Sequence, residues 1–247
     1  MPANRVARVV LRVRDMKRTR TIITWPLACA IACPLLVTAA AQSPKSWSIA
    51  LTSTSDVAPH GVQASAVTHN GKRAVRLVGE SNETESYAMV AGPSLRDGSI
   101  EADIAGRPGQ GANEAARGFV GIAFRVRADH SAFECFYLRP TNGRANDQLR
   151  RNHSTQYVSH PEFPWPRLRK EAPGVYESYV DLVPSEWTHV RIDFRDRHAE
   201  LYVHRAPQPV LIVNDLKLEP VAGGVGLFIG TGTEGFFRDL KVTATSP

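Results

Sequence analysis

Hydrophobic and polar residues along most of this chain alternate with a period of two, not with the 3.6-residue period of a helix. One segment shows the pattern clearly, because Ile100, Ala102 and Ile104 fall on one face and Glu101 and Asp103 on the other. Such alternation is typical of a β-strand that buries one face and exposes the other. We therefore predict a strand in this segment.

Two pairs of alternating segments predict β-hairpins, because turn-forming residues separate the two members of each pair. The paired segments are 118–126 with 132–139, and 187–194 with 199–203. Further strands are predicted at 73–78, 86–90, 99–104, 225–229 and 236–242. Many short strands with almost no helical period favour an all-β sandwich.

The first hairpin also predicts which side chains share its second face. With a simple register, Cys135, Tyr137 and Arg139 lie on that face beside Arg125. The cysteine lies in a strand-like run between Glu134 and Phe136, so we expect it to be a buried structural thiol.

Residues 140–186 form the longest stretch without a clear period. Long loops inside a domain are usually functional or disordered, and the aromatic content here argues against disorder. Aromatic faces stack on sugar rings, while arginine forks bind vicinal hydroxyls or carboxylates, so an acidic sugar would also suit the segment. The candidate ligand-binding residues are Arg125, Tyr137, Arg139, Arg150, Arg151, His153, Tyr157 and Trp165. Alternatively, these side chains only fasten the long segment to its own sandwich through internal ion pairs.

The positive charge of the chain is concentrated at its N-terminus. The whole sequence has 30 Lys and Arg against 24 Asp and Glu, but residues 1–41 hold seven of the basic side chains and one acidic one. Residues 42–247 are therefore formally neutral. Binding to nucleic acid requires clustered positive charge on the folded domain, so we expect no nucleic-acid partner.

The N-terminal segment has the features of a secretory signal peptide. A short basic stretch after Met16 precedes a mostly apolar run, and three alanines end at Ala41. Pro26 and Pro34 interrupt the apolar run, which disfavours a transmembrane helix. We expect an N-terminal extension and signal peptide over 1–41, translated from Met1 or Met16 and cleaved after Ala41. The mature protein would be one domain over 42–247, periplasmic or secreted, with no membrane contact after cleavage.

Four groups of residues in the predicted strands resemble a known superfamily. They are Asp97–Ile104, Gly121–Arg125, Trp187–Val190 followed by Leu201–Val203, and Gly235–Val242. Together they resemble the concanavalin A-like lectin/glucanase superfamily. More narrowly, they resemble the laminin-G-like and 3-keto-disaccharide-hydrolase-like domains of exported bacterial proteins. The resemblance covers roughly residues 92–243. It implies a jelly-roll sandwich of two antiparallel sheets, here with a long polar and aromatic insertion, that binds a saccharide across its concave face.

The same resemblance bears on catalysis. The family-sixteen glucanases of this superfamily carry a Glu-x-Asp-x-x-Glu motif on one strand, and the nearest match here is Glu101, Asp103 and Gly106. Because retaining hydrolysis requires two carboxylates, the glycine in the third position argues against glucanase activity. The sequence therefore favours a carbohydrate-binding protein without glucanase activity.

Two alternatives to a binding protein stay open. One is a hydrolase or lyase that acts on sugars, in which Glu134, Glu171, Glu177 or His153 would serve as acid or base. The other is a structural or protein-binding domain of the cell envelope. The sequence does not determine the oligomeric state or the saccharide.

Metal and cofactor motifs are sparse in the sequence. His153 and His160 lie seven residues apart without a zinc-binding motif around them, and we predict no metal site and no cofactor. The resemblance to laminin-G-like domains allows calcium, although no Asp-rich ligand loop is present.

Overall fold

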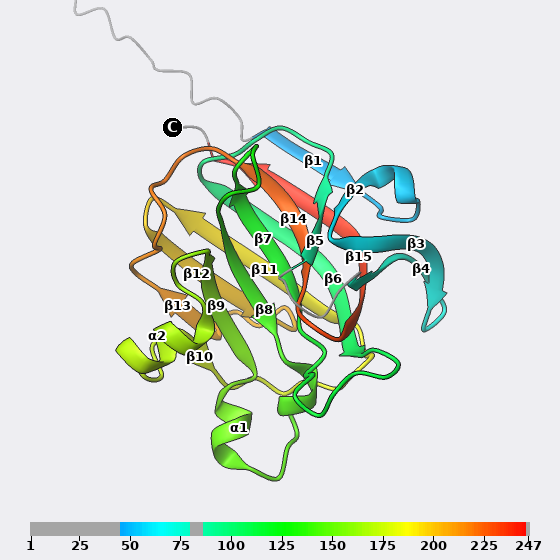
Figure 1. Cartoon of the computed structure of the whole chain (residues 1–247). Coiled ribbons are helices and arrows are strands. Elements are labelled where there is room, and N and C mark those ends of the chain that lie inside the picture. The colour runs from blue at the N-terminus through cyan, green and yellow to red at the C-terminus, as the bar shows by residue number, and fades with distance from the viewer. Residues whose placement is uncertain (1–44, 80–85, 246–247) are drawn as a thin grey trace, which may run out of the picture. The chain divides into compact units, whose positions relative to one another are not determined.

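The computed structural model describes residues 45–79 and 86–245, and its strands form two antiparallel sheets that pack face to face (Figure 1). The predicted N-terminal extension and signal peptide lie outside the described residues. The packing of the sheets buries the predicted apolar faces, since the rings of Phe124 and Phe194, one from each sheet, lie 4.6 Å apart.

In the described part of the chain, eight strands make up the first sheet. Their order is β13-β12-β11-β6-β15-β4-β3, and β1 pairs with β15. The bounds are β1 Lys45–Ile49, β3 Val62–His69, β4 Lys72–Gly79, β6 Gly98–Pro108, β11 Thr188–Arg195, β12 His198–Val203, β13 Leu211–Val213 and β15 Thr233–Ala244. The long strand β15 pairs with β6 on one side, and with β4 and then β1 on the other.

Seven of the described strands make up the second sheet, in the order β10-β9-β8-β7-β14-β5-β2. The bounds are β2 Val57–His60, β5 Ser86–Val90, β7 Val120–Val126, β8 Phe133–Leu138, β9 Thr155–His160, β10 Glu177–Ser178 and β14 Gly224–Ile229.

Short helices connect the strands. The helix α1 spans Gln148–Asn152 and α2 spans Trp165–Glu171, while 3-10 turns cover Thr54–Asp56 and Pro140–Asn142. Within the described ranges, no helix has the length and apolar character needed to cross a membrane.

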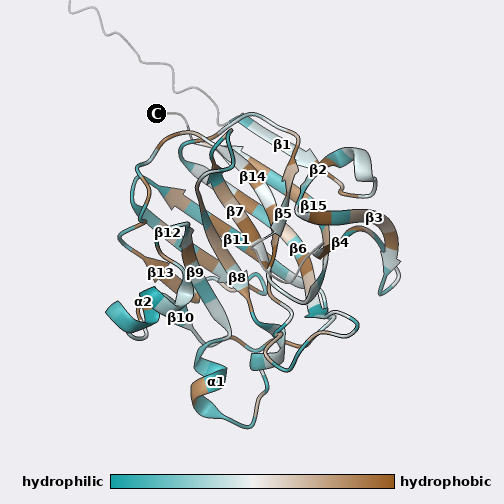
Figure 2. Cartoon of the chain, in the orientation of Figure 1, coloured by the Kyte–Doolittle hydropathy of each residue, from teal (hydrophilic) through white to brown (hydrophobic). Residues whose placement is uncertain are grey.

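Hydrophobic residues concentrate on the strands, while α2 is mostly hydrophilic (Figure 2). Ile100, Ala102 and Ile104 are buried as the alternation predicts, and Cys135 is buried as well. Both predicted hairpins are present, because β7 pairs with β8 and β11 pairs with β12. The prediction of an all-β jelly-roll sandwich is thus confirmed.

The segment 140–186 contains more regular structure than its sequence period indicates. The strands β9 and β10 lie within it and extend the second sheet beyond β8. Every residue from Thr155 to Ser159 is buried, including the polar Gln156. Because β9 is covered on both faces and carries polar groups inside, its sequence shows no alternation of apolar and polar positions.

Candidate functional site

A single row of residues crosses the outer face of the second sheet, with one residue from each of six neighbouring strands. In order from β5 to β10, the row consists of Tyr87, Phe228, Gly121, Tyr137, Gln156 and Glu177. The row is aromatic at the β5 end and polar at the β10 end. The outer face therefore places hydrogen-bonding groups beside an aromatic surface.

Gly121 allows the aromatic part of this row to form. A Cβ atom at this position would lie 2.2 Å from the carbonyl oxygen of Phe136 and 2.6 Å from the Cα of Tyr137. Without a side chain between them, the rings of Tyr137 and Phe228 stack with their centroids 5.5 Å apart. Phe119 meets Tyr137 edge-on at 5.9 Å. These three rings form an apolar floor.

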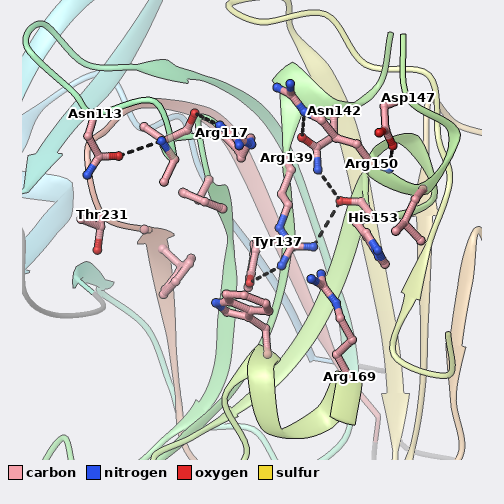
Figure 3. Close-up of a pocket in the computed structure, with 17 residues that line it drawn as sticks. Asn113, Arg117, Tyr137, Arg139, Asn142, Asp147, Arg150, His153, Arg169 and Thr231 are labelled. Atoms are coloured by element: carbon pink, nitrogen blue, oxygen red, sulfur yellow. Dashed lines mark hydrogen bonds between the residues drawn. The ribbon is translucent and has the colours of Figure 1, made fainter. Parts of the chain in front are cut away.

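A pocket of about 680 Å³ lies over this floor (Figure 3). Its lining residues come from 113–119, 137–142, 147–153, 165–169 and 228–231. Pockets of about 300–1,000 Å³ are typical of small-molecule sites. Three of the five lining segments belong to or border the insertion 140–186, so the insertion builds one side of the pocket.

Arg139 is the most extensively bonded arginine in the pocket. Its Nη2 donates to Tyr137 Oη at 3.1 Å and to Gln156 Oε1 at 2.9 Å. Its Nη1 donates to Glu177 Oε1 at 3.0 Å and to the carbonyl oxygen of His153 at 3.2 Å. The residue is 4% exposed. Arg139 thus fixes side chains from β8, β9 and β10 in one arrangement.

Glu177 balances much of the positive charge beside the pocket. Arg169 donates to both of its carboxylate oxygens, and His153 Nδ1 lies 2.9 Å from Oε2. Burial by itself would raise the pKa of Glu177. The hydrogen bond from Arg169 and the charges of Arg139 and Arg169 outweigh burial and hold that pKa below its ordinary value. Glu177 is therefore ionised at neutral pH.

His153 is held neutral by the same surroundings. Burial lowers the pKa of His153, and the charges of Arg169 and Arg139 lower it further against the opposing effect of Glu177. The guanidinium groups of Arg139 and Arg169 point toward one another in Figure 3, and His153 lies beside them. The site therefore combines fixed guanidinium groups with an uncharged imidazole.

The helix α1 is anchored to the turn that precedes it. Asp147 caps the helix by accepting a hydrogen bond from the backbone NH of Arg150 at 2.7 Å. The Nε of Arg150 donates to Asn142 Oδ1 at 2.9 Å, and Asn142 Nδ2 donates to the carbonyl oxygen of His153 at 3.0 Å. These bonds hold the Arg150 side chain against the pocket.

Trp165 begins the helix α2 and is 41% exposed. The guanidinium carbon of Arg169 lies 4.6 Å from the ring centroid of Trp165, and that of Arg139 lies 5.8 Å away. Cation–π contacts therefore orient the indole while a large part of it stays accessible to a ligand.

Five of the eight ligand-binding residues proposed from the sequence line this pocket. They are Tyr137, Arg139, Arg150, His153 and Trp165. Arg125, Arg151 and Tyr157 do not line it. The structure thus brings most of the proposed set together.

Arg125 does not share the face of Tyr137 and Arg139, and the expected simple register is wrong at this position. Its backbone adopts a φ of 52°, and its side chain is 1% exposed. The guanidinium donates to the carbonyl oxygens of Arg96 at 2.8 Å and Asp196 at 2.7 Å, and to Asp97 Oδ1 at 3.1 Å. The left-handed backbone ends the alternation, so Arg125 secures loops instead of bordering the pocket.

Tyr157 and Glu134 lie on the face of the second sheet that packs against the first. Tyr157 Oη donates to Glu134 Oε2 at 2.6 Å, and the backbone NH of Leu218 donates to Glu134 Oε1 at 2.8 Å. Both residues are fully buried, and burial raises the pKa of Glu134 despite these hydrogen bonds. The pair anchors the loop near Leu218 and does not reach the pocket.

Arg151 and Glu171 have partners away from the pocket. Arg151 Nη2 donates to Tyr179 Oη at 2.9 Å, and Arg167 Nε donates to Glu171 Oε1 at 2.8 Å. Of the four acid–base candidates, the structure therefore places only Glu177 and His153 beside the pocket.

Several lining residues were not among those proposed from the sequence. They include Arg117, Phe119, Asn142, Asp147, Arg169 and Phe228. The sequence could have indicated Arg169, because it follows Trp165 by four residues and residues at this spacing share one face of a helix. Phe119 and Phe228 reach the pocket through strand pairing, which the local sequence does not show.

The carboxylates at the pocket do not fit a calcium site. Calcium takes six to eight oxygen ligands, whereas Asp147 caps a helix and Glu177 binds arginines. Across residues 45–79 and 86–245, no group of three or more His, Cys, Asp or Glu side chains is arranged to hold a metal ion.

Comparison with known proteins gives structural likenesses only. No protein-family model and no curated protein sequence matches this chain. A Bacillus subtilis protein of unknown function with a galectin-like fold is similar at a TM-score of 0.52 and 12% identity, covering 81% of this chain and 98% of that one. The metal-free exoplasmic/lumenal domain of VIP36 is similar at a TM-score of 0.50 and 11% identity, covering 75% of this chain and 84% of that one.

A third similar structure is the carbohydrate-binding module CBM66 from Bacillus subtilis. Its TM-score is 0.48 and its identity 13%, covering 74% of this chain and 96% of the module. At such low identities, structural likeness shows the fold alone. The fold is an all-β jelly-roll sandwich of two antiparallel sheets, similar to the galectin-like fold of the first of these structures.

Proposed function

We propose that this protein is an exported carbohydrate-binding protein and that the pocket on the outer face of the second sheet is its saccharide site. One observation carries the proposal: the pocket joins aromatic surfaces to fixed hydrogen-bond donors. Sugar rings have apolar faces and hydroxyl edges, so a site for them requires both kinds of group.

Trp165, Phe119 and Tyr137 supply the aromatic surfaces in this proposal. Arg150 supplies a donor whose position is set by neighbouring groups before any ligand arrives. Arg139 already donates its four Nη hydrogens, and it orders the side chains around it. Because side chains that are already ordered lose little entropy on binding, such a site needs few contacts to hold a small ligand.

A glycan-array screen of the purified protein tests the proposal, with two variants as a matched pair. Trp165 and Tyr179 are both 41% exposed, and each has an arginine over its ring, but only Trp165 lines the pocket. We expect Trp165→Ala to lower the affinity for the bound glycan about tenfold or more, as loss of an aromatic anchor does. Tyr179→Ala should bind as the unchanged protein does.

Two results would contradict this proposal. An array on which no glycan binds would remove the proposed function. Equal binding by the Trp165→Ala and Tyr179→Ala variants would place the saccharide outside the pocket.

A sugar-acting hydrolase or lyase is the second candidate, in keeping with the narrower resemblance to 3-keto-disaccharide-hydrolase-like domains. The observation in its favour is the neutral His153 beside the ionised Glu177 at the pocket, since such an imidazole can accept a proton. Incubating each bound glycan with the protein and analysing products by mass spectrometry decides between the candidates. Products that are lost in His153→Gln would favour the enzyme.

Export is the remaining part of the proposal. It rests on the signal-like segment 1–41 and the domain boundary that this segment implies. N-terminal sequencing of the protein recovered from the periplasm or the medium should begin at Gln42. An intact N-terminus at Met1 would contradict export by this route.

A further inference from the structure

Four arginines line the pocket, and they differ in how their charge is balanced. They are Arg117, Arg139, Arg150 and Arg169. Arg139 and Arg169 share the carboxylate of Glu177. Among the described residues, Arg117 and Arg150 form no ion pair with a carboxylate.

Neutral oxygens hold both of these arginines in place. Arg150 binds Asn142 Oδ1 and the two oxygens of Thr141, at 2.9–3.3 Å. Arg117 donates to the carbonyl oxygens of Glu114 and Ala116. These contacts orient the two guanidinium groups without an ion pair to a carboxylate.

The positive groups also act on one another. Burial lowers the pKa of Arg117, and the charges of Arg150 and Arg139 lower it further against the opposing charge of Glu114. Asp147 is the single lining residue with a carboxylate, and it caps α1. With Glu177 included, four arginines face two carboxylates among the described residues of the site. A negatively charged group in the pocket would relieve this repulsion.

We propose that the saccharide bound in the pocket is acidic, and that its carboxylate or sulfate group is bound by Arg117 and Arg150. This inference rests on the proposed function and names the class of its ligand. Guanidinium groups match the oxygens of such anions with two parallel hydrogen bonds. Clustered positive charge in a hollow also raises the local concentration of anionic ligands.

A paired glycan array tests the class of ligand. Oligosaccharides of galacturonic, glucuronic, mannuronic and guluronic acid are printed as free acids and as methyl esters. Sulfated glycans are printed with their desulfated forms, beside neutral glycans. We expect at least one acidic glycan to bind about tenfold or more tightly than its uncharged form, since hydrogen bonds to a charged group are stronger than those to a neutral one. Whether uronates or sulfated glycans bind shows which anion is recognised.

The outcomes separate this inference from the proposed function. If the uncharged forms bind as tightly as the acidic ones, the inference is overturned and carbohydrate binding stands. If no glycan binds, both are overturned. Binding of the acidic forms alone, weakened by added salt, supports both.

Variants test the two arginines against a matched control. We expect Arg117→Gln and Arg150→Gln each to lower the affinity for the acidic glycan about tenfold, with a smaller effect on its uncharged form. Arg195→Gln removes the same charge from an exposed position on β11, outside the pocket, and should leave the affinity unchanged. Equal losses for acidic and uncharged glycans, or an equal loss in Arg195→Gln, would overturn the assignment of these arginines to the anion.

Discussion

Arg125, in β7, and Arg139, directly after β8, are two buried arginines, and each lies beside a carboxylate. The other bonds of Arg125 go to backbone carbonyl oxygens of Arg96 and Asp196. The other bonds of Arg139 include the side chains of Tyr137 and Gln156. One guanidinium therefore secures loops, and the other organises the side chains around a pocket.

The hydrogen-bond partners of a buried arginine therefore indicate its role better than its degree of burial does. When a guanidinium donates to buried backbone carbonyl oxygens, its removal leaves those oxygens without a hydrogen-bond donor inside the protein. A guanidinium that holds pocket side chains affects a ligand through every group that it positions. Substitutions at the two positions should therefore separate stability from binding.

The largest effect is expected from Arg125→Met. Removing this guanidinium leaves two carbonyl oxygens without a donor and abolishes the ion pair with Asp97, which keeps only Arg96 as a charged partner among the described residues. The free energy of unfolding should fall by about 3–5 kcal/mol, as when one partner of a buried ion pair is lost. Urea denaturation measures the change. The affinity of the remaining folded protein for its glycan should be unchanged, and a loss of affinity at equal stability would place Arg125 in the site.

Arg139→Met should impair both properties. Glu177 keeps Arg169 as a partner, so the loss of stability should lie near the lower limit for a buried pair, about 3 kcal/mol. Glycan affinity should fall about a hundredfold or more, because Tyr137, Gln156 and Glu177 all lose the group that positions them. Titration calorimetry at a temperature where the variant is folded measures the affinity. If Arg139→Met bound the glycan as tightly as the unchanged protein does, Arg139 would have a structural role only, as Arg125 has.

The stability that Glu177 contributes beside the pocket should depend on pH in the acidic range. The folded pKa of Glu177 lies below its ordinary value of 4.5, so the unfolded chain binds more protons between these two values. Its contribution to stability is therefore complete above pH 4.5 and is lost as the pH falls through the folded pKa, at up to about 1.4 kcal/mol per pH unit.

Denaturation of the unchanged protein and of Glu177→Gln across this acidic range isolates the contribution. The difference in stability between the two proteins should shrink as the pH falls. Glu171→Gln is a control that removes an exposed carboxylate paired with Arg167, and it should change stability by no more than about 1 kcal/mol. A difference that stays constant with pH would mean that Glu177 is not held ionised by its neighbours.

The smallest effect is expected from Arg151→Gln. Arg151 belongs to the same basic run as Arg150, but it contacts Tyr179 outside the pocket. Exposed contacts of this kind contribute about 0–1 kcal/mol, so stability should change by no more than that. Glycan affinity, measured by calorimetry, should not change. A loss of affinity would extend the site beyond the pocket.

The sandwich itself was predictable because several of its strands alternate apolar and polar positions. The alternation in β6 and β11 indicates which residues face the core, and both hairpins follow from the turns between the predicted strands. The strand β9 was not predictable in this way, because its buried positions include the polar residues Thr155, Gln156 and Ser159.

The site was predictable only in part. The density of aromatic and basic residues in 140–186 indicated Arg150, His153 and Trp165, and the outer face of the first hairpin indicated Tyr137 and Arg139. Density along the chain does not show which residues meet, so Tyr157 and Arg151 were included although neither lines the pocket.

The sequence by itself determined the fold class and the segment that builds one side of the pocket, since both follow from the local periodicity of hydrophobic residues and from local composition. The tertiary structure decided which side chains converge there. Strand register places Phe228, Gly121, Tyr137 and Gln156 in one row. The left-handed backbone of Arg125 turns its own side chain away from that row. The physical reason is that pairing between strands joins positions far apart in the chain, and no local pattern records which positions those are.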